Sequence, residues 1–194
     1  HFPSLGRLAA LRFLEWVQKN PEGVVSLPTG KTPEYFIRWV QHILQTWEET
    51  ETRKELEAAG LDTSSAPRMD GLHFVQIDEF YPIHPDHDHS FYSYVKHFYI
   101  DGFGLDPDRA MLINCADIGL PDRATLDDVW PDGEVDLSLR YRSPHSALEN
   151  LQQQVLFNIE EWCQEYEYKI QEMAGIVCFL GGIGPDGHIG FNVR

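Results

Sequence analysis

Four short apolar runs alternate along this chain with longer segments of helical periodicity, and this alternation limits the fold more than any other feature. Each run has the length of a buried strand, whereas the segments between the runs are long enough for helices. The runs cover residues 24–27, 72–77, 110–113 and 176–180. Strands that alternate with helices in this way are typical of a parallel sheet. We therefore expect an α/β fold with a mostly parallel, Rossmann-like sheet and helices on both of its faces.

The segments between the runs carry apolar residues at the spacing of amphipathic helices. Thr32 followed by Pro33 predicts an N-cap with proline at the first helical position. Ser90 is expected to cap the helix that follows it. The expected helices cover about residues 5–17, 33–43, 91–99 and 146–172.

The length of 194 residues is enough for one domain with a sizeable core, and we expect a single domain over 1–194. Residues 117–144 are rich in Asp, Pro and Gly, and their lack of periodicity predicts a surface insertion. The cysteines are widely spaced without a Cys-x-x-Cys pair, which favours buried structural thiols over disulfides or a zinc site. They are Cys115, Cys163 and Cys178.

The net charge of −16 argues against a nucleic-acid partner, because such binding depends on clustered Lys and Arg. No apolar run approaches the ~20 residues of a membrane-spanning helix, so we expect no membrane partner either. The N-terminal residues lack the uninterrupted apolar stretch of a signal peptide, which favours the cytoplasm. The oligomeric state stays open, and a homo-oligomer is compatible with the sequence.

Three polar or glycine-rich loops directly follow predicted strands. In an open parallel sheet such loops meet at the carboxyl edge, where ligands bind. The first loop holds Thr29, Gly30, Lys31 and Thr32 before a helix start, so its backbone N–H groups, hydroxyls and positive charge suit a phosphate. An ordinary strand-to-helix turn with a threonine cap is the alternative.

The second loop begins with Asp78 and Glu79, where the predicted strand over 72–77 ends. Neighbouring strand residues point to opposite faces, so only one of the two carboxylates needs to enter a cleft. A carboxylate held beside substrate carbons can act as a proton shuttle. A solvated acidic pair that caps the loop is the alternative.

The third loop, within residues 179–192, is the most specific signal in the chain. Asp186 and His188 flank Gly187, close enough for the carboxylate to orient the imidazole for acid–base chemistry. The glycines of this loop allow turns and close ligand approach. They are Gly181, Gly182, Gly184 and Gly187.

Two other patterns imitate known sites. LPTGKT followed by FVQIDE is similar to the motifs of P-loop ATPases, but Val25 stands where that phosphate loop needs glycine. His84, His87 and His89 are of the type that binds metals, yet they lie in a Pro- and Asp-rich loop without a partner cluster. A hydrated loop is the better interpretation, and we expect no metal.

The three loops, in this order, resemble the motifs of the glucosamine-6-phosphate deaminase family. The family pattern reads LPTGGTP, a strand ending in DEY, and GGxGxDGHIAFNEP, where this chain has LPTGKTP, DEF and GGIGPDGHIGFN. The segment after Asp78 also aligns without a gap and places a family histidine at His87. The resemblance extends from the first expected helix to Asn192, except for residues 117–144.

This resemblance implies an enzyme that acts on a small-molecule sugar phosphate. His188, with Asp186, would assist opening of the sugar ring. Asp78 would then move a proton between C2 and C1, so that an aldose becomes a ketose and ammonia is released. No metal or organic cofactor is implied. The residues that would bind substrate and phosphate are Thr29, Gly30, Lys31, Thr32, Gly182 and Gly187.

The chain departs from the family pattern in three places. Lys31 replaces a glycine, Val193 replaces a glutamate that supports the histidine, and the sequence stops at Arg194 where the family continues. We therefore expect the sequence to be incomplete at its C-terminal end. Two alternatives stay open: a 6-phosphogluconolactonase-like hydrolase, which shares the GPDGH string, and a non-catalytic sugar-phosphate-binding relative.

Overall fold

In the computed structural model, which describes residues 2–183 and 187, the chain divides into two compact units. As far as it is described, the first unit contains residues 1–76, 94–111 and 176–194. The second unit contains residues 77–93 and 112–175. The expectation of a single domain stays a prediction.

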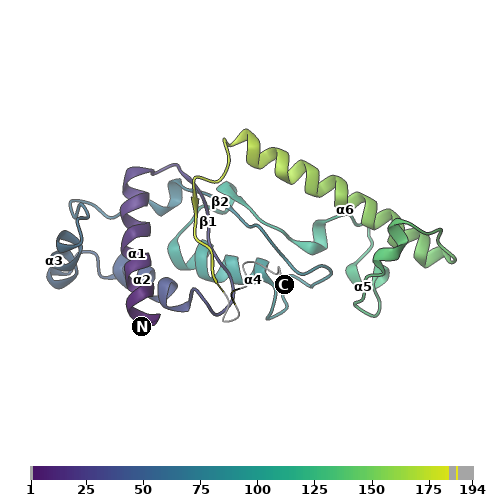
Figure 1. Cartoon of the computed structure of the whole chain (residues 1–194), viewed down its shortest axis with the longest axis horizontal. Coiled ribbons are helices and arrows are strands. Elements are labelled where there is room, and N and C mark those ends of the chain that lie inside the picture. The colour runs from purple at the N-terminus through teal and green to yellow at the C-terminus, as the bar shows by residue number, and fades with distance from the viewer. Residues whose placement is uncertain (1, 184–186, 188–194) are drawn as a thin grey trace. The chain divides into compact units, whose positions relative to one another are not determined.

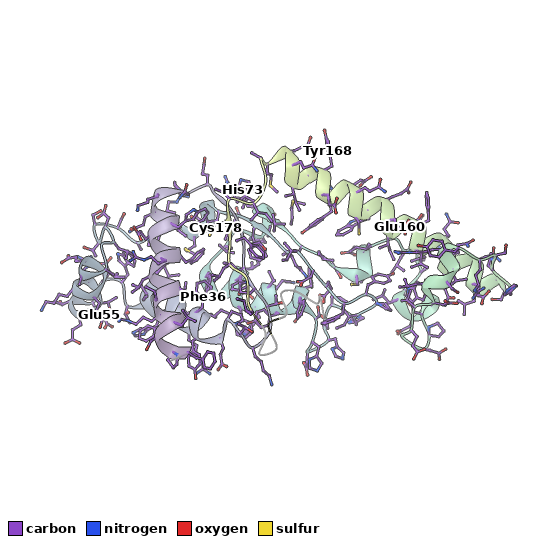
Figure 2. The ribbon with its side chains drawn as sticks, viewed as in Figure 1. Phe36, Glu55, His73, Glu160, Tyr168 and Cys178 are labelled. Atoms are coloured by element: carbon purple, nitrogen blue, oxygen red, sulfur yellow. The ribbon has the colours of Figure 1, made fainter. Side chains whose placement is uncertain are left out.

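The first unit is built on a four-stranded sheet in which all neighbouring strands are parallel. Val25 lies at its centre, paired with Phe74 on one side and Cys178 on the other. His73 and Cys178, labelled in Figure 2, mark two of the strands. The order is β3-β2-β1-β4, with β1 at Val24–Ser26, β2 at His73–Val75, β3 at Ala110–Met111 and β4 at Cys178–Phe179. This sheet confirms the predicted α/β class and the four predicted strands, each shorter than its apolar run.

The helices of the first unit follow the apolar periodicity of the sequence. Helix α1 packs against α2, as Figure 1 shows, and their backbones come close because Gly6 has no side chain. A Cβ atom at Gly6 would lie 2.5 Å from the Cβ of Tyr35. The buried stripe of α1 contains Ala10, Phe13, Leu14 and Val17, the spacing of a single helical face. The bounds are Phe2–Lys19 for α1, Glu34–Gln45 for α2 and Thr50–Ala58 for α3, with short 3-10 turns η1 (Met69–Gly71) and η3 (Pro107–Arg109) before β2 and β3.

Aromatic side chains join these helices to the sheet. The ring of Phe36 on α2, labelled in Figure 2, lies 5.5 Å from that of Phe13 and 6.0 Å from that of Phe103, measured between centroids. Tyr99 extends the cluster, 5.1 Å from Phe103 and 5.7 Å from Phe74 on β2. The buried core of the first unit is therefore an aromatic cluster at which helices and sheet meet.

The helix predicted after Ser90 is present, but its second half is not an α-helix. Helix α4 spans Phe91–Val95, and the π-helix η2 continues it over Lys96–Asp101. The Ser90 hydroxyl accepts a hydrogen bond from the Ser93 N–H at 3.2 Å, as expected for a cap. Within η2, hydrogen bonds join residues five apart, so side chains take positions that an α-helix would not give them.

The second unit packs short helical segments against one long helix. Residues 117–144, interpreted from the sequence as a surface insertion, supply buried side chains to its core. The segments are η4 (Cys115–Asp117), α5 (Leu126–Val129), η5 (Leu137–Arg140) and α6 (Ala147–Glu172). The core residues are Cys115, Leu126, Val129, Trp130, Leu139, Val155 and Leu156.

Helix α6 begins where the sequence predicts. Ser146 is its N-cap, and the serine hydroxyl accepts a hydrogen bond from the Glu149 N–H at 3.1 Å. Glu160 on this helix, labelled in Figure 2, pairs with Arg140 of η5 at 2.9 Å. None of the helices in the described ranges is long and apolar enough to cross a membrane.

The three cysteines are free thiols in different environments. Cys115 is buried, Cys178 on β4 is half-buried, and Cys163 on α6 is exposed. The expectation of three buried thiols is therefore wrong for Cys163. The reason is that α6 buries only Val155 and Leu156 and leaves most of its remaining length open to solvent.

Candidate functional site

The strand order of the first unit singles out one place at the sheet edge. From β1 the chain moves outward on one side to β2 and β3, and then returns to place β4 on the other side of β1. The order of strands therefore reverses between β1 and β4. In open parallel sheets, ligands bind at such a reversal, beyond the carboxyl ends of the strands. The segments that leave β1 and β4 there are residues 27–33 and 180–183.

These two segments are in direct contact. The Leu180 N–H donates a hydrogen bond to the Ser26 carbonyl at 3.1 Å. A Cβ atom at Gly182 would lie 3.1 Å from Cγ2 and 3.3 Å from Cβ of Thr32, which is tighter than a normal contact. A side chain at position 182 would therefore require the exposed Thr32 side chain to move by a few tenths of an ångström. The structure brings together one residue from each of two segments that the sequence singles out.

The loop after β1 presents unused hydrogen-bond donors. Gly30 has a φ angle of +81°, a left-handed conformation that favours glycine. Lys31 and Thr32 are exposed. Among the residues that the structure describes, the N–H groups of Thr29, Gly30, Lys31 and Thr32 donate to no protein acceptor. Free N–H groups before a helix are suited to an anion.

Thr32 is not the N-cap that the sequence predicts. Helix α2 starts at Glu34, so Pro33 occupies the cap position, and no side chain caps the helix. The reason is a turn in which the Glu34 N–H approaches the Lys31 carbonyl at 3.4 Å, which moves the helix start by one residue. This change takes the Thr32 hydroxyl out of the capping role and leaves it exposed on the loop.

Two tyrosine hydroxyls donate hydrogen bonds to backbone carbonyls of the loop after β1, and the sequence analysis identifies neither of them. Tyr94 Oη donates to the Gly30 carbonyl at 2.8 Å, and Tyr99 Oη donates to the Pro28 carbonyl. Burial, and then the charge of Glu34, raise the pKa of Tyr94 to about 12. Burial also raises the pKa of Tyr99 well above its usual value. Both phenols therefore stay protonated and able to donate near neutral pH.

The spacing of the two tyrosines explains why no pattern found them. Residues five apart point about 140° from each other in an α-helix, so they do not share a face. The π-helix changes this relation, and the rings of Tyr94 and Tyr99 lie 6.1 Å apart. The available signal was the aromatic run over residues 91–99, which also provides helix packing.

In the second unit, Asp78 and Glu79, which follow β2, have different roles. The Glu79 carboxylate accepts hydrogen bonds from the Ser90 hydroxyl at 2.9 Å, the Phe91 N–H at 3.0 Å and the Tyr92 N–H at 2.7 Å. It thereby stabilises the first turn of α4, a helix-capping role that the sequence analysis does not assign to Glu79. Asp78 is half-buried, and burial, followed by the charge of Glu79, raises its pKa. A raised pKa brings a carboxylate closer to the range of a general base.

The predicted residues of the glycine loop are only partly described. Asp186 and His188 lie outside the described residues. Gly187 is exposed and has a φ angle of +84°, a conformation that again favours glycine. Whether these residues, Asp78 and the loop after β1 form one site stays a prediction.

The histidine-rich loop has the geometry of an exposed turn. The Asp86 N–H donates to Nδ1 of His84 at 3.3 Å, and the His89 N–H donates to Nδ1 of His87 at 3.1 Å. Both contacts join residues two positions apart on the surface. Over the described part of the chain, no group of three His, Cys, Asp or Glu side chains is placed to hold a metal ion.

Comparisons with known proteins agree with the motif resemblance, although no family model matches. A glucosamine-6-phosphate deaminase of Halothermothrix orenii is 25% identical over 192 residues, covering 99% of this chain and 56% of the relative. One of Bacillus pumilus is 26% identical over 188 residues, covering 97% and 54%. One of Borreliella afzelii is 63% identical over 35 residues, 18% of this chain and 13% of the relative.

A solved structure described as a monomeric glucosamine-6-phosphate deaminase shares the fold. It has a TM-score of 0.61 and 19% identity, and the match covers 98% of this chain and 56% of that chain. The resemblance inferred from the motifs is thereby confirmed over nearly the whole sequence. The chain spans about half the length of the curated relatives that match it along its length.

Proposed function

We propose that this chain carries the substrate site of a glucosamine-6-phosphate deaminase, which converts an amino-sugar phosphate from aldose to ketose and releases ammonia. The observation that carries the proposal is the contact between Gly182 and the Thr32 loop at the strand-order reversal. There, N–H groups that donate to no acceptor among the described residues lie at the place where such folds bind ligands. The substrate class, a small sugar phosphate, is taken from the names of the relatives.

In this proposal the loops share the work of binding and chemistry. The N–H groups of residues 29–32 and the Lys31 charge hold the phosphate, while Gly182 and Gly187 permit close approach of the sugar. His188, oriented by Asp186, opens the ring. Asp78 then moves a proton from C2 to C1, which converts C2 to an iminium, and water adds to C2 and displaces the nitrogen as ammonia. The raised pKa of Asp78 suits the proton transfer because transfer is most efficient near the operating pH.

The proposal needs no metal or organic cofactor for this chemistry. A net charge of −16 also favours small ligands over nucleic acids, because it repels a long phosphate backbone. Lys31, the cationic residue of the loop, would attract a phosphate only locally. We further propose the cytoplasm as the compartment and a single domain as the unit that carries the site.

The test is Asp78→Asn, measured by deuterium exchange at C2 of glucosamine 6-phosphate together with ammonia release. The amide keeps the shape of the side chain and loses the base, so exchange should fall by ~10²–10⁴-fold. The KM should change little, because the lost interaction belongs to the transition state. Asp88→Asn, in the exposed loop of the same segment, is the matched control and should retain full activity.

The same assay separates the proposed function from its alternatives. Hydrolysis of 6-phosphogluconolactone without C2 exchange would assign the chain to the lactonases. Binding of a hexose phosphate without either reaction would identify a non-catalytic relative. Normal exchange in Asp78→Asn would remove Asp78 from the mechanism.

A further inference from the structure

The direction of the peptide groups decides whether the loop after β1 can bind an anion. A peptide group is planar and trans, so its carbonyl oxygen and its N–H point in opposite directions. The Pro28 carbonyl therefore sets the direction of the Thr29 N–H, and the Gly30 carbonyl sets that of the Lys31 N–H. Any group that holds these two carbonyls also aims these two amides.

The tyrosine hydroxyls hold both carbonyls. Tyr94 Oη bonds the Gly30 oxygen at 2.8 Å, and Tyr99 Oη bonds the Pro28 oxygen. The Thr29 and Lys31 N–H groups must then point to the side of the loop away from the tyrosines. This fits the finding that neither amide donates to a protein acceptor among the described residues.

Both phenols pack against other aromatic rings, and Tyr99 does so in the core of the first unit. Tyr99 is fully buried, with its ring 5.7 Å from Phe74 and 5.1 Å from Phe103. The ring of Tyr94 lies 4.5 Å from that of Phe98. Because these ring contacts and the two hydrogen bonds are present without a ligand, the peptide directions are set before any ligand arrives, which lowers the ordering cost of binding.

We propose that Tyr94 and Tyr99 are positioning residues for the substrate phosphate, acting through the Gly30 and Pro28 carbonyls to aim the Lys31 and Thr29 amides at it. This inference rests on the proposed function, because it assigns the phosphate to this loop. The tyrosines do not touch the substrate. Their effect is on affinity for the phosphate group and not on proton transfer.

The experiment compares Tyr94→Phe, Tyr99→Phe and the double variant with the parent protein. Each single variant loses only one hydroxyl and keeps the packed ring. Affinity for inorganic phosphate, measured by calorimetry, should fall roughly 3- to 10-fold for each single variant, the effect of one lost hydrogen bond, and further for the double variant, which loses two. The KM for glucosamine 6-phosphate should rise similarly while kcat stays near that of the parent. Tyr141→Phe, at a tyrosine 90% exposed in the second unit, is the control and should change nothing.

The outcomes separate a positioning role from a merely structural one. Variants that melt at lower temperature but bind phosphate like the parent would overturn the proposal, as would a parent that binds no phosphate. If Tyr99→Phe fails to fold, Tyr94→Phe decides alone, because Tyr94 lies outside the fully buried set. Phosphate binding that weakens in the variants of a parent without C2 exchange would support this inference and refute the deaminase proposal.

Discussion

Gly30 has a left-handed backbone with a φ angle of +81°, and a Cβ atom there would meet nothing within 4 Å. Substitution is therefore opposed by the backbone conformation alone and not by a clash. We expect Gly30→Ala to lower the free energy of unfolding by about 1–2 kcal/mol, and Gly30→Asn by less, because Asn tolerates this region better. Urea denaturation measures the change.

A second glycine provides the control for this prediction. Gly104 has a φ angle of +75° and equally open surroundings, but it lies outside the loop after β1. Gly104→Ala should lower stability to a similar extent and leave phosphate affinity unchanged, whereas Gly30→Ala should lower both. Equal phosphate affinity in the two variants would show that the conformation of Gly30 does not matter for binding.

At the scale of elements, the sequence predicts best where one residue sets a boundary. The predicted Ser90 cap places the start of α4 at Phe91, because the serine hydroxyl accepts a hydrogen bond from the Ser93 N–H. The same kind of pattern predicts Thr32 as an N-cap, and this prediction is wrong. A turn that begins at Lys31 includes Thr32 and Pro33, so α2 starts only at Glu34. A cap motif indicates that a helix begins nearby, and the turn before it decides at which residue.

Elements without a regular period could not be read from the sequence. The segment over 117–144 folds into 3-10 turns and the short helix α5, so its buried residues, such as Val129 and Leu139, fall at no helical or strand spacing. The π-helix η2 could not be predicted from the sequence for the same reason. The role of the tyrosines that bond the loop after β1 is therefore visible only in the three-dimensional structure. The loop itself is predictable from its glycine and from its position after a strand.

Arg142 joins η5 to the start of α6 through two carboxylates. Its guanidinium lies 2.7 Å from Asp136 and 2.8 Å from Glu149. The Ser138 hydrogen bonds and Arg142 lower the pKa of Asp136 to about 2, and Arg142 with the His145 N–H lowers that of Glu149 to about 2. Lowered carboxylate pKa values stabilise the fold above the unfolded-state pKa near 4, and this contribution disappears as pH falls toward 2.

Arg142→Met should therefore destabilise the protein at pH 7 and have much less effect at pH 2. Thermal denaturation across this range should show a smaller fall in Tm on acidification than in the parent. Arg140→Met removes a single exposed pair with Glu160 and should change Tm less, because such pairs contribute little. A parallel downward shift of Tm at every pH would mean that Arg142 acts through packing and not through charge.

At the scale of the whole molecule, the two units differ in how they are built. The first unit has a parallel sheet whose strand order reverses between β1 and β4, so the place of the candidate site follows from topology once the order is known. Sequence alone predicts that the strands are parallel but not their order, because the pairing partners of β1 lie far along the chain. The second unit has a helical core of its own.

Separate cores predict that the units can open separately. Leu139 and Leu14 are both 0% exposed, the first in the second unit and the second on α1 in the first unit. Each Leu→Ala change should cost about 2–5 kcal/mol through lost burial and a cavity. The cost should appear mainly in the unit that contains the cavity, because sub-global opening follows cooperative structural units.

Hydrogen exchange of backbone amides measures this directly. Leu139→Ala should speed exchange in α6 far more than in β1 and β2, and Leu14→Ala should do the reverse. If the site residues of the first unit keep their exchange rates in Leu139→Ala, phosphate affinity should also be unchanged in that variant. Equal acceleration in both units by either substitution would mean that the chain opens as one cooperative body, and it would favour the single domain expected from the sequence over two separate folding units.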